Sequence, residues 1–530
     1  MAIRPNEHRS TKCLELRSIP GALSWLLLLA LVITSIASAK DLDERKWIFA
    51  ESDHFSIYSA QSKRKTENLL IHLEALRSIF SGDTRVERLL NSKPTRLLAT
   101  ASVTDYRQLH VMAGSVGVYR STLRENFIVV AQSFQMSEAQ VMLHEFAHFA
   151  LRSTSQYAFP AWWDEGYAEY VSGSRLHHDS FDIGLPLKGR LNDLDHVRWL
   201  PWDKLLALTS TSGLSGDETA AFYAQAWLLV HYLHNREDKS RSISASWERF
   251  ANQMHHSNDP VESFENAFGI SAKTLPSRVK KYARKSRFSY QRMNQRDLPF
   301  SKAVTVRTVD RQEIRTQLGQ FALSNEDSES ARHWFERILS EQEQHAAAIA
   351  GLAGVLTLDE QFEQAAEQFT VALELAPDNA EILVDSALLD LKRAAAPDAW
   401  FTSLDLLNAA EGKLIKARSI VGATTEIDTN LAYTWLSQNE DSYPAIELLI
   451  YVVKNAPSEN WPRLLLAESM LRAGFTDKAR SLAELVERHD HGRSSSTARA
   501  RRLLQRIEND DISADRSLPA IAPPKLPSSD

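Results

Sequence analysis

The sequence predicts an α+β domain followed by an all-α solenoid of stacked helical hairpins. In the first half, short segments that alternate aromatic or β-branched residues with polar ones precede longer segments of helical periodicity. Beyond Arg311 the pattern changes, and alanines return in a 34-residue register, from Ala331 to Ala365 and from Ala445 to Ala479. The chain has 530 residues, of which 43% are hydrophobic and 24% charged, so it can bury several domain-sized cores.

Residues 1–39 have the features of a secretory signal peptide: a net basic start, an apolar run over Ala22–Ile36 and the small residues Ala37-Ser38-Ala39. Cleavage before Lys40 would place the body of the protein outside the cytoplasm, in a bacterial periplasm or secreted. The alternative is an uncleaved membrane anchor, although the run is shorter than the roughly 20 residues that a bilayer span needs. The single cysteine, Cys13, lies in the removed segment, so the mature chain would have no disulfide.

The charge of the chain argues against a nucleic-acid partner. Its formal net charge is -7, and no basic block dominates any part of it. Binding to a phosphate backbone depends on clustered lysine and arginine residues. We therefore predict that no nucleic acid binds, and that no stable membrane span remains after signal cleavage.

The α+β part of the prediction depends on a succession of short strands and longer helices. Strands are expected at Trp47–Phe49, Phe55–Tyr58, Arg96–Thr100 and Phe127–Val130. Between the second and third of these, Lys63–Phe80 repeats leucines at helical spacing and is followed by Ser-Gly-Asp, which ends a helix. The last strand leads into a helix that carries two histidines.

Those histidines stand four residues apart in the sequence His144-Glu145-Phe146-Ala147-His148. Four residues advance a helix by about 400°, so both imidazoles lie on one face, one turn apart, and can bind one metal ion. A catalytic zinc usually has three protein ligands and a water. Glu165, on the next predicted helix, is the first choice for the third ligand, and Glu145 occupies the position of a general base.

The two halves of this pattern together resemble the gluzincin metallopeptidases, and more closely the bacterial peptidase MA-like group. The second half is Pro160-Ala161-Trp162-Trp163-Asp164-Glu165-Gly166-Tyr167-Ala168-Glu169. The resemblance implies a zincin-like catalytic domain in which His144, His148 and Glu165 bind Zn²⁺ and Glu145 activates water. Sixteen residues separate His148 from Glu165, fewer than in the aminopeptidase branch of the group, so the intervening loop is shorter.

Other residues near the motif have candidate supporting roles. Glu169 lies four residues after Glu165, on the same helix face, and metal-bound imidazoles usually donate their second N–H to an acceptor. We expect Glu169 to accept from His144, the alternative being a solvated helix acid. Asp164 is expected to be a cap or surface residue, and Trp162 and Trp163 to pack in the core.

Tyr223 is the candidate for stabilising the oxyanion. It lies 58 residues after Glu165, close to where the resemblance places a tyrosine that donates to the developing negative charge. The alternative is a core aromatic residue. His231, on the same apolar segment, is a weaker candidate, because a lone histidine there usually serves packing.

The segment from Ser172 to Leu200 contains glycine, proline and several histidines, and we expect a surface loop beside the cleft. A second metal site at His177 and His178 is disfavoured, since adjacent residues rarely chelate together without further ligands. After it, the sequence predicts the end of the catalytic domain, spanning 40–295, and a polar linker at 296–311.

The remainder of the chain resembles tetratricopeptide (TPR) repeats. Leu318-Gly319, Ala331 and Phe335 occupy the positions that mark such a repeat, and the 34-residue register predicts about five helical hairpins over 312–493. A hairpin cannot bury its own apolar face, so the units are expected to stack into a solenoid. Residues 494–530 should hold the end of a helix and a disordered, proline-rich tail.

These observations favour an exported zinc metallopeptidase that hydrolyses peptide bonds and uses its TPR solenoid to recruit a protein partner or substrate. The alternative is a noncatalytic TPR scaffold whose zincin domain is structural or inactive. Presence of Glu145 beside the three ligands favours the enzyme, because metal binding alone does not require it. The sequence indicates neither the substrate nor endo- versus exo-cleavage.

Overall fold

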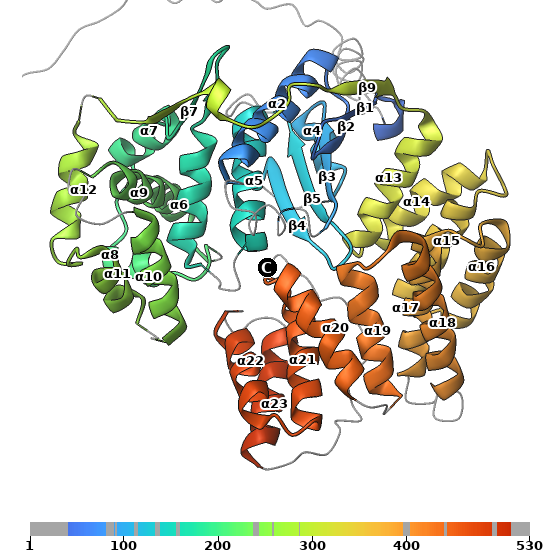
Figure 1. The fold of residues 1–530 in the computed structure, drawn as a ribbon. Helices are drawn as coiled ribbons and strands as arrows, with labels where there is room; N and C mark the ends of the chain where they lie inside the picture. Colours follow the sequence, from blue (N-terminus) through green and yellow to red (C-terminus); the bar gives the residue numbers. More distant parts are fainter. Residues whose placement is uncertain are drawn as a thin grey trace, which may run out of the picture. The chain divides into compact units, whose positions relative to one another are not determined.

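The computed structural model describes residues 41–80, 90, 93–110, 115–132, 138–154, 159–211, 213–236, 243–256, 259–285, 287–395, 403–438, 442–489 and 495–509. The expected signal peptide, with Cys13, and the proline-rich tail lie outside these residues. Asp43–Asp530 forms one compact unit (Figure 1). Within the described parts of the chain, no helix has both the length and the apolar character needed to cross a membrane.

A mixed sheet forms the first layer of the amino-terminal domain. Within the described residues its strand order is β4-β5-β3-β2-β1-β9. The strands are β1 (Ile48–Glu51), β2 (Ser56–Ser59), β3 (Thr95–Thr100), β4 (Gly117–Ser121), β5 (Asn126–Ala131) and β9 (Thr305–Thr308). β3 pairs in parallel with β2 and β5, whereas β4 runs antiparallel to β5 at the edge. All of β5 is buried, as its continuous apolar run requires.

Helices cover the sheet and extend the domain. α2 (Lys63–Phe80) and α5 (Glu138–Thr154) pack against each other and against the sheet, where Phe146 of α5 contacts Phe55 and Phe80. The other helical elements are η1 (Leu42–Glu44), α4 (Val103–Arg107), α6 (Ala161–Ser172), α7 (Lys188–His196), α8 (Trp202–Ala207), α9 (Gly216–Asn235), α10 (Ile243–His256), α11 (Pro260–Phe268), α12 (Leu275–Ala283) and η2 (Gln295–Asp297).

Two predictions about this domain are wrong. The expected surface loop from Ser172 to Leu200 contains β6 (Arg175–Leu176), the buried strand β7 (Ser180–Ile183) and α7, and β7 also pairs with β8 (Gln291–Asn294). The expected linker at 296–311 contains β9, which pairs with β1. These strands have two to four residues, too few for alternation of polar and apolar residues to identify them.

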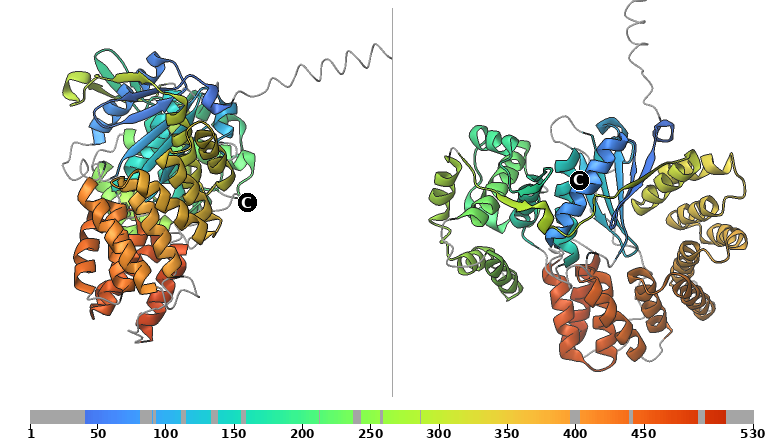
Figure 2. Two further views of the ribbon diagram at one scale, coloured as in Figure 1. Left: turned by 90° about the vertical axis from the view of Figure 1, so that its right-hand side faces the viewer. Right: turned by 45° about the horizontal axis from the view of Figure 1, so that its top comes forward.

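The carboxy-terminal helices pair into successive hairpins, which lie side by side in the right-hand view of Figure 2. They are α13 (Arg311–Ser324), α14 (Ser328–Leu339), α15 (Ala346–Leu358), α16 (Phe362–Leu375), α17 (Ala380–Ala394), α18 (Ser403–Val421), α19 (Thr425–Ser437), α20 (Ser442–Asn455), α21 (Asn460–Arg472), α22 (Thr476–His489) and α23 (Ser495–Glu508). The described helices from α13 to α22 make five hairpins, as the 34-residue register predicts.

Small residues allow these helices to approach closely. The ring of Phe335 on α14 lies against Gly319 of α13 and Gly351 of α15, where a Cβ atom would overlap it. The register residues Ala331 and Ala365 are fully buried. The repeated small and aromatic positions of the sequence are therefore the contacts between successive hairpins.

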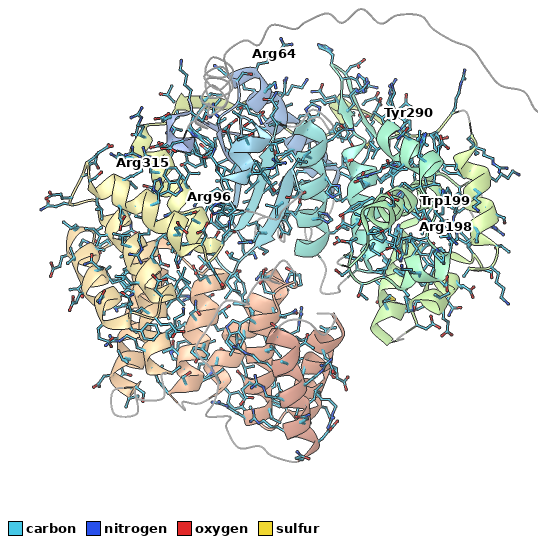
Figure 3. The ribbon with its side chains drawn as sticks, turned by 180° about the vertical axis from the view of Figure 1, so that it is seen from behind. Arg64, Arg96, Arg198, Trp199, Tyr290 and Arg315 are labelled. Carbon is cyan, nitrogen blue, oxygen red and sulfur yellow. The ribbon has the colours of Figure 1, made fainter. Side chains whose placement is uncertain are left out.

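The first solenoid helix, α13, packs on the amino-terminal domain. The ring centroids of Phe321 on α13 and Phe127 on β5 are 5.5 Å apart. Arg96 of β3 donates to the side chain of Gln320 at 3.2 Å, and Arg315 of α13 donates to Asp43 at 2.7 Å. Arg96 and Arg315 are labelled in Figure 3. The solenoid is thus in direct contact with the sheet.

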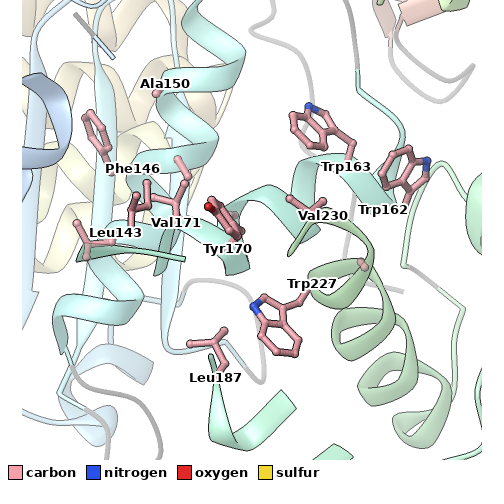
Figure 4. Packing of buried hydrophobic residues seen from close by; sticks show 14 of the residues in the cluster. Leu143, Phe146, Ala150, Trp162, Trp163, Tyr170, Val171, Leu187, Trp227 and Val230 are labelled. Atoms are coloured by element: carbon pink, nitrogen blue, oxygen red, sulfur yellow. The ribbon is translucent and has the colours of Figure 1, made fainter. Parts of the chain in front are cut away.

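The core beside the histidine helix is formed by α5, α6 and α9 (Figure 4). Trp162 and Trp163 of α6 are buried, as expected, and the ring centroid of Trp162 lies 5.7 Å from that of Phe264. At Gly166 a Cβ atom would lie only 2.5 Å from the carbonyl oxygen of Ala226 on α9. Glycine therefore permits the close approach of α6 to α9.

Candidate metal centre

Three predicted ligands come together between α5 and α6. His144 and His148 stand one turn apart on α5, and Glu165 lies in the first half of α6. One donor atom from each residue lies within 4.8 Å of the other two. The turn at Pro160 allows α6 to begin where it can pack back against α5. The residues that the sequence placed in one motif thus share one site.

The distances between the donor atoms fit a tetrahedral metal ion. The Nε2 atoms of His144 and His148 are 3.2 Å apart, and Glu165 Oε2 lies 3.4 Å from the first and 3.6 Å from the second. Metal–ligand bonds of about 2.0 Å at tetrahedral angles separate neighbouring ligands by about 3.3 Å. The donor set of two imidazoles and a carboxylate is also one that zinc accepts. The residues present therefore fit Zn²⁺.

Carboxylates also face the other nitrogen of each imidazole. Asp164 Oδ1 lies 3.1 Å from His148 Nδ1, and Glu169 Oε1 lies 3.7 Å from His144 Nδ1. Glu169 is thus near His144, but 3.7 Å exceeds a hydrogen bond, and the same Oε1 atom accepts from Arg190 at 2.6 Å, so its predicted role stays a prediction. The expectation for Asp164 as a cap or surface residue is wrong, because the start of α6 directs it toward His148.

The histidines and carboxylates of the cluster shift each other's pKa values. Burial opposes protonation of His148, but the carboxylates of Asp164 and Glu165 outweigh it and raise the pKa of His148 to about 10. Burial likewise opposes ionisation of Glu165, but the two histidines hold the pKa of its carboxyl well below the usual range. The site thus attracts positive charge, which a proton or a metal cation can supply, and binding of a metal would release protons.

Glu145 lies beside the edge strand of the sheet. Its side chain is 9% exposed, and a Cβ atom built on Gly117 of β4 would lie 3.0 Å from its Oε1 atom. The same Cβ atom would overlap Val141 of α5. Only glycine lets β4 pass this close to α5, so the strand forms a wall of the site next to the candidate general base.

Tyr223 reaches the same region from α9. Its ring lies 5.1 Å from the guanidinium carbon of Arg190, and Arg190 in turn donates to Glu169 at 2.6 Å. Burial, reinforced by the carboxylates of Glu165 and Glu169, raises the pKa of Tyr223 far above its ordinary value. The phenol therefore remains protonated and can act as a hydrogen-bond donor.

The other histidines considered from the sequence lie elsewhere. His231 is buried, contacts the Tyr282 hydroxyl at 2.8 Å and the Gly184 carbonyl at 2.9 Å, and burial lowers its pKa to about 4. It is a packing residue with both ring nitrogens satisfied. His177 contacts Asp182 at 3.0 Å and lies in the turn between β6 and β7.

Asp164 and Arg190 are the two residues of the site that sequence reasoning missed. Asp164 directly precedes Glu165, and neighbouring residues on a helix point about 100° apart, so helical spacing gave no reason to group them. Arg190 lies on α7, within the segment that was expected to be a loop. The role of Arg190 could have been predicted only if that segment had been predicted as a helix.

Comparisons with known proteins concern the fold alone. No protein-family model and no curated protein matches the chain. Among solved structures, it is similar to TTC0263, a TPR protein of Thermus thermophilus, with 18% identity over 37% of this chain and 99% of that chain and a TM-score of 0.32. It is also similar to YrrB, a TPR protein with an unusual peptide-binding site (14% identity, 36% of this chain, 90% of that chain, TM-score 0.27). A TPR protein of Parabacteroides merdae gives 14% identity over 50% of this chain and 93% of that chain, with a TM-score of 0.26.

Proposed function

We propose that this protein is an exported zinc-dependent metallopeptidase whose helical solenoid binds a protein substrate or partner. The observation that carries the proposal is the convergence of His144, His148 and Glu165 at tetrahedral spacing, with Glu145 on the same helix turn. Export depends on the signal-like residues 1–39, and sequencing of the mature amino terminus should begin at Lys40.

The chemistry divides between the ion and the chain. Zn²⁺ would be held by His144, His148 and Glu165 and would supply Lewis-acid chemistry toward a peptide carbonyl and water. Glu145 accepts the proton of the attacking water and returns it to the leaving amine. Tyr223 donates a hydrogen bond to the oxygen that gains negative charge. Asp164 and Glu169 hold the imidazoles in orientation.

The edge of the sheet supports a peptide as substrate. β4 ends the strand order, so in the described part of the chain one side of this strand has no pairing strand. An extended peptide can pair with such an edge through main-chain hydrogen bonds. Because Gly117 of β4 lies next to Glu145, a peptide bound there would place its carbonyls beside the candidate base.

Metal analysis combined with a peptide library tests the proposal. The purified chain should contain one zinc and cleave peptides, and a chelator should abolish cleavage. Glu145→Gln should keep the zinc and lower the turnover rate by at least roughly a hundredfold, the scale of a lost general base. His148→Ala should lose the zinc. Full zinc occupancy in His148→Ala, or undiminished cleavage by Glu145→Gln, would contradict the assigned roles.

Tyr223→Phe tests the oxyanion donor separately. The substitution removes one hydroxyl and keeps the ring over Arg190, so we expect unchanged zinc content and a kcat lower by roughly a hundredfold, with little change in KM. Tyr232→Phe on the same helix is the matched control and should keep full activity. A Tyr223→Phe enzyme as fast as the wild type would assign Tyr223 to packing.

A noncatalytic interaction protein is the second candidate. The observation that favours it is the solenoid itself, since stacked hairpins form the extended surfaces that repeat proteins use for binding. In that case the wild-type chain should hold zinc yet cleave nothing in a broad peptide library, while still binding a protein partner.

A further inference from the structure

The β4–β5 hairpin reaches from the sheet to the solenoid. β4 and β5 pair in register from Gly117–Val130 to Ser121–Asn126, and the Thr122 N–H donates to the Glu125 carbonyl at 2.9 Å to close the turn. Arg124 lies at this turn. The hairpin therefore presents a guanidinium at the end of two strands, one of which is the edge strand beside the metal centre.

Arg124 enters a group of carboxylates on the solenoid. Its Nε atom donates to Glu426 on α19 at 2.7 Å, and its Nη2 atom donates to Asp385 on α17 at 2.5 Å. Nearby, Lys93 donates to Glu459, the residue that precedes α21, at 2.5 Å and to the hairpin carbonyl of Thr122 at 2.7 Å. We name the solenoid surface of Glu381, Asp385, Glu426 and Glu459 the acidic inner face.

The four carboxylates of the acidic inner face are met by two cations, Arg124 and Lys93. Burial raises the pKa of Glu426 despite the attraction of Arg124, and repulsion from Asp385 and Glu381 adds to this. Arg96 does not relieve this shortage of positive charge, because its guanidinium pairs with the adjacent hairpin residue Glu125 at 2.8 Å. Clustered carboxylates on successive first helices of the hairpins form a surface suited to guanidinium and ammonium groups.

We propose that the acidic inner face is a docking site for an arginine- or lysine-bearing segment of a partner protein, and that the β4–β5 hairpin occupies this site until such a segment displaces it. The inference rests on the partner-binding part of the proposed function and needs no hydrolysis. Charge complementarity identifies the partner segment as basic, and the seated Arg124 shows the contact that it would reproduce.

Displacement of the β4–β5 hairpin would also affect the candidate metal centre. β4 continues directly from the hairpin turn to Gly117, where an added Cβ atom would overlap Val141 and lie 3.0 Å from Glu145 Oε1. Displacement of the hairpin breaks the Arg124 contacts together with the bonds from Arg120 to the Ser324 carbonyl and from Ser121 to Glu459, each of 3.0 Å, and so frees the far end of this strand from the solenoid. A basic partner would thus act on the wall of the site through the strand, without touching the metal ligands.

A binding measurement on the full chain tests the docking site. The probe is a fluorescent synthetic peptide copying residues 119–128, and all proteins carry Glu145→Gln so that the probe is not cleaved. Removing the seated guanidinium by Arg124→Ala should tighten probe binding by roughly tenfold or more, because Asp385 and Glu426 are no longer masked. Arg64→Ala, an exposed arginine on α2, is the matched control and should bind like the parent.

The charge requirement is tested on both sides of the contact. A probe with glutamine in place of its arginines should not bind, and Asp385→Asn with Glu426→Gln should remove binding in the Arg124→Ala background. Equal affinity of the parent and Arg124→Ala, or equal binding of the neutral probe, would overturn the proposal. Loss of peptidase activity has no bearing on these results, so the two proposals can fail independently.

Hydrogen exchange provides a second measurement that needs no Arg124 variant. Saturating probe added to the chain with Glu145→Gln alone should speed amide exchange over residues 117–126 and slow it in α17 and α19. Probe that binds while exchange over 117–126 stays unchanged would refute displacement of the hairpin.

Discussion

At the scale of single residues, the first half of α6 combines several roles in a few positions. Glu165 faces the ring nitrogens of both histidines, Asp164 faces the far nitrogen of His148, and Glu169 faces that of His144. The three carboxylates surround the imidazoles and set the charge of the site. Their different directions follow from the 100° step between residues of a helix.

Substitution Asp164→Asn tests whether this residue orients His148. The amide keeps the size of the side chain but removes the negative charge, so zinc affinity should fall by roughly 10- to 100-fold. Competition with a chromophoric chelator measures the affinity. Asp203→Asn on α8, an exposed acid of the same type, is the control and should leave affinity unchanged. Unaltered zinc affinity in Asp164→Asn would show that Asp164 does not orient His148.

At the scale of elements, the site depends on the distance between α6 and α9. Gly166 follows the candidate ligand Glu165 and lies against the carbonyl of Ala226. α6 carries the candidate ligand Glu165 and α9 carries the candidate donor Tyr223, so one glycine sets the separation of the two helices. Val230 of α9 lies at the same contact, where its Cγ2 atom would be 2.9 Å from a Cβ atom on Gly166 (Figure 4).

Gly166→Ala should separate these helices. A Cβ atom 2.5 Å from a backbone oxygen cannot be accommodated by rotation of a side chain, so α6 must shift. We expect a loss of about 2 kcal/mol in the free energy of unfolding, a typical cost of overpacking, together with weaker zinc binding. Urea unfolding and zinc titration measure the two effects. Gly189→Ala on α7, where a Cβ would meet nothing within 4 Å, should show neither.

At the scale of the whole molecule, a buried ion pair joins the solenoid to the start of the amino-terminal domain. Arg315 of α13 and Asp43 are both almost fully buried, and Arg337 of α14 also contacts Asp43 at 3.1 Å. The same guanidinium of Arg315 reaches the exposed Glu341 at 2.8 Å. Segments separated by more than half of the chain thus depend on each other.

Asp43→Asn should destabilise this connection. It leaves the buried guanidinium of Arg315 without its buried counter-charge, which costs about 3 kcal/mol. Glu341→Gln removes the exposed partner of the same arginine and should cost less than about 1 kcal/mol. Urea midpoints of the two variants and the wild type measure the difference. Equal midpoints for both variants would show that burial does not strengthen the pair.

Local periodicity was enough to predict much of the fold and part of the site. The spacing of His144 and His148 placed both on one helix face, because an α-helix has a fixed turn, and the 34-residue register predicted the hairpins, because each must bury its apolar face on the next. The TPR character of the chain follows from that register. The role of each site residue stays a prediction until metal content and cleavage are measured.

Contacts between residues distant in the chain could not be obtained in this way. β9 joins the sheet through main-chain pairing, which leaves little trace in a four-residue sequence, and Arg190 reaches Glu169 only because α7 folds over α9. Arg124 similarly acquires its partners from two separate helices of the solenoid. The periodicity of a sequence predicts which face of a helix or strand is apolar. It does not predict which helices and strands pack against each other. The environments of Asp164, Arg190 and Arg124 depend on that packing.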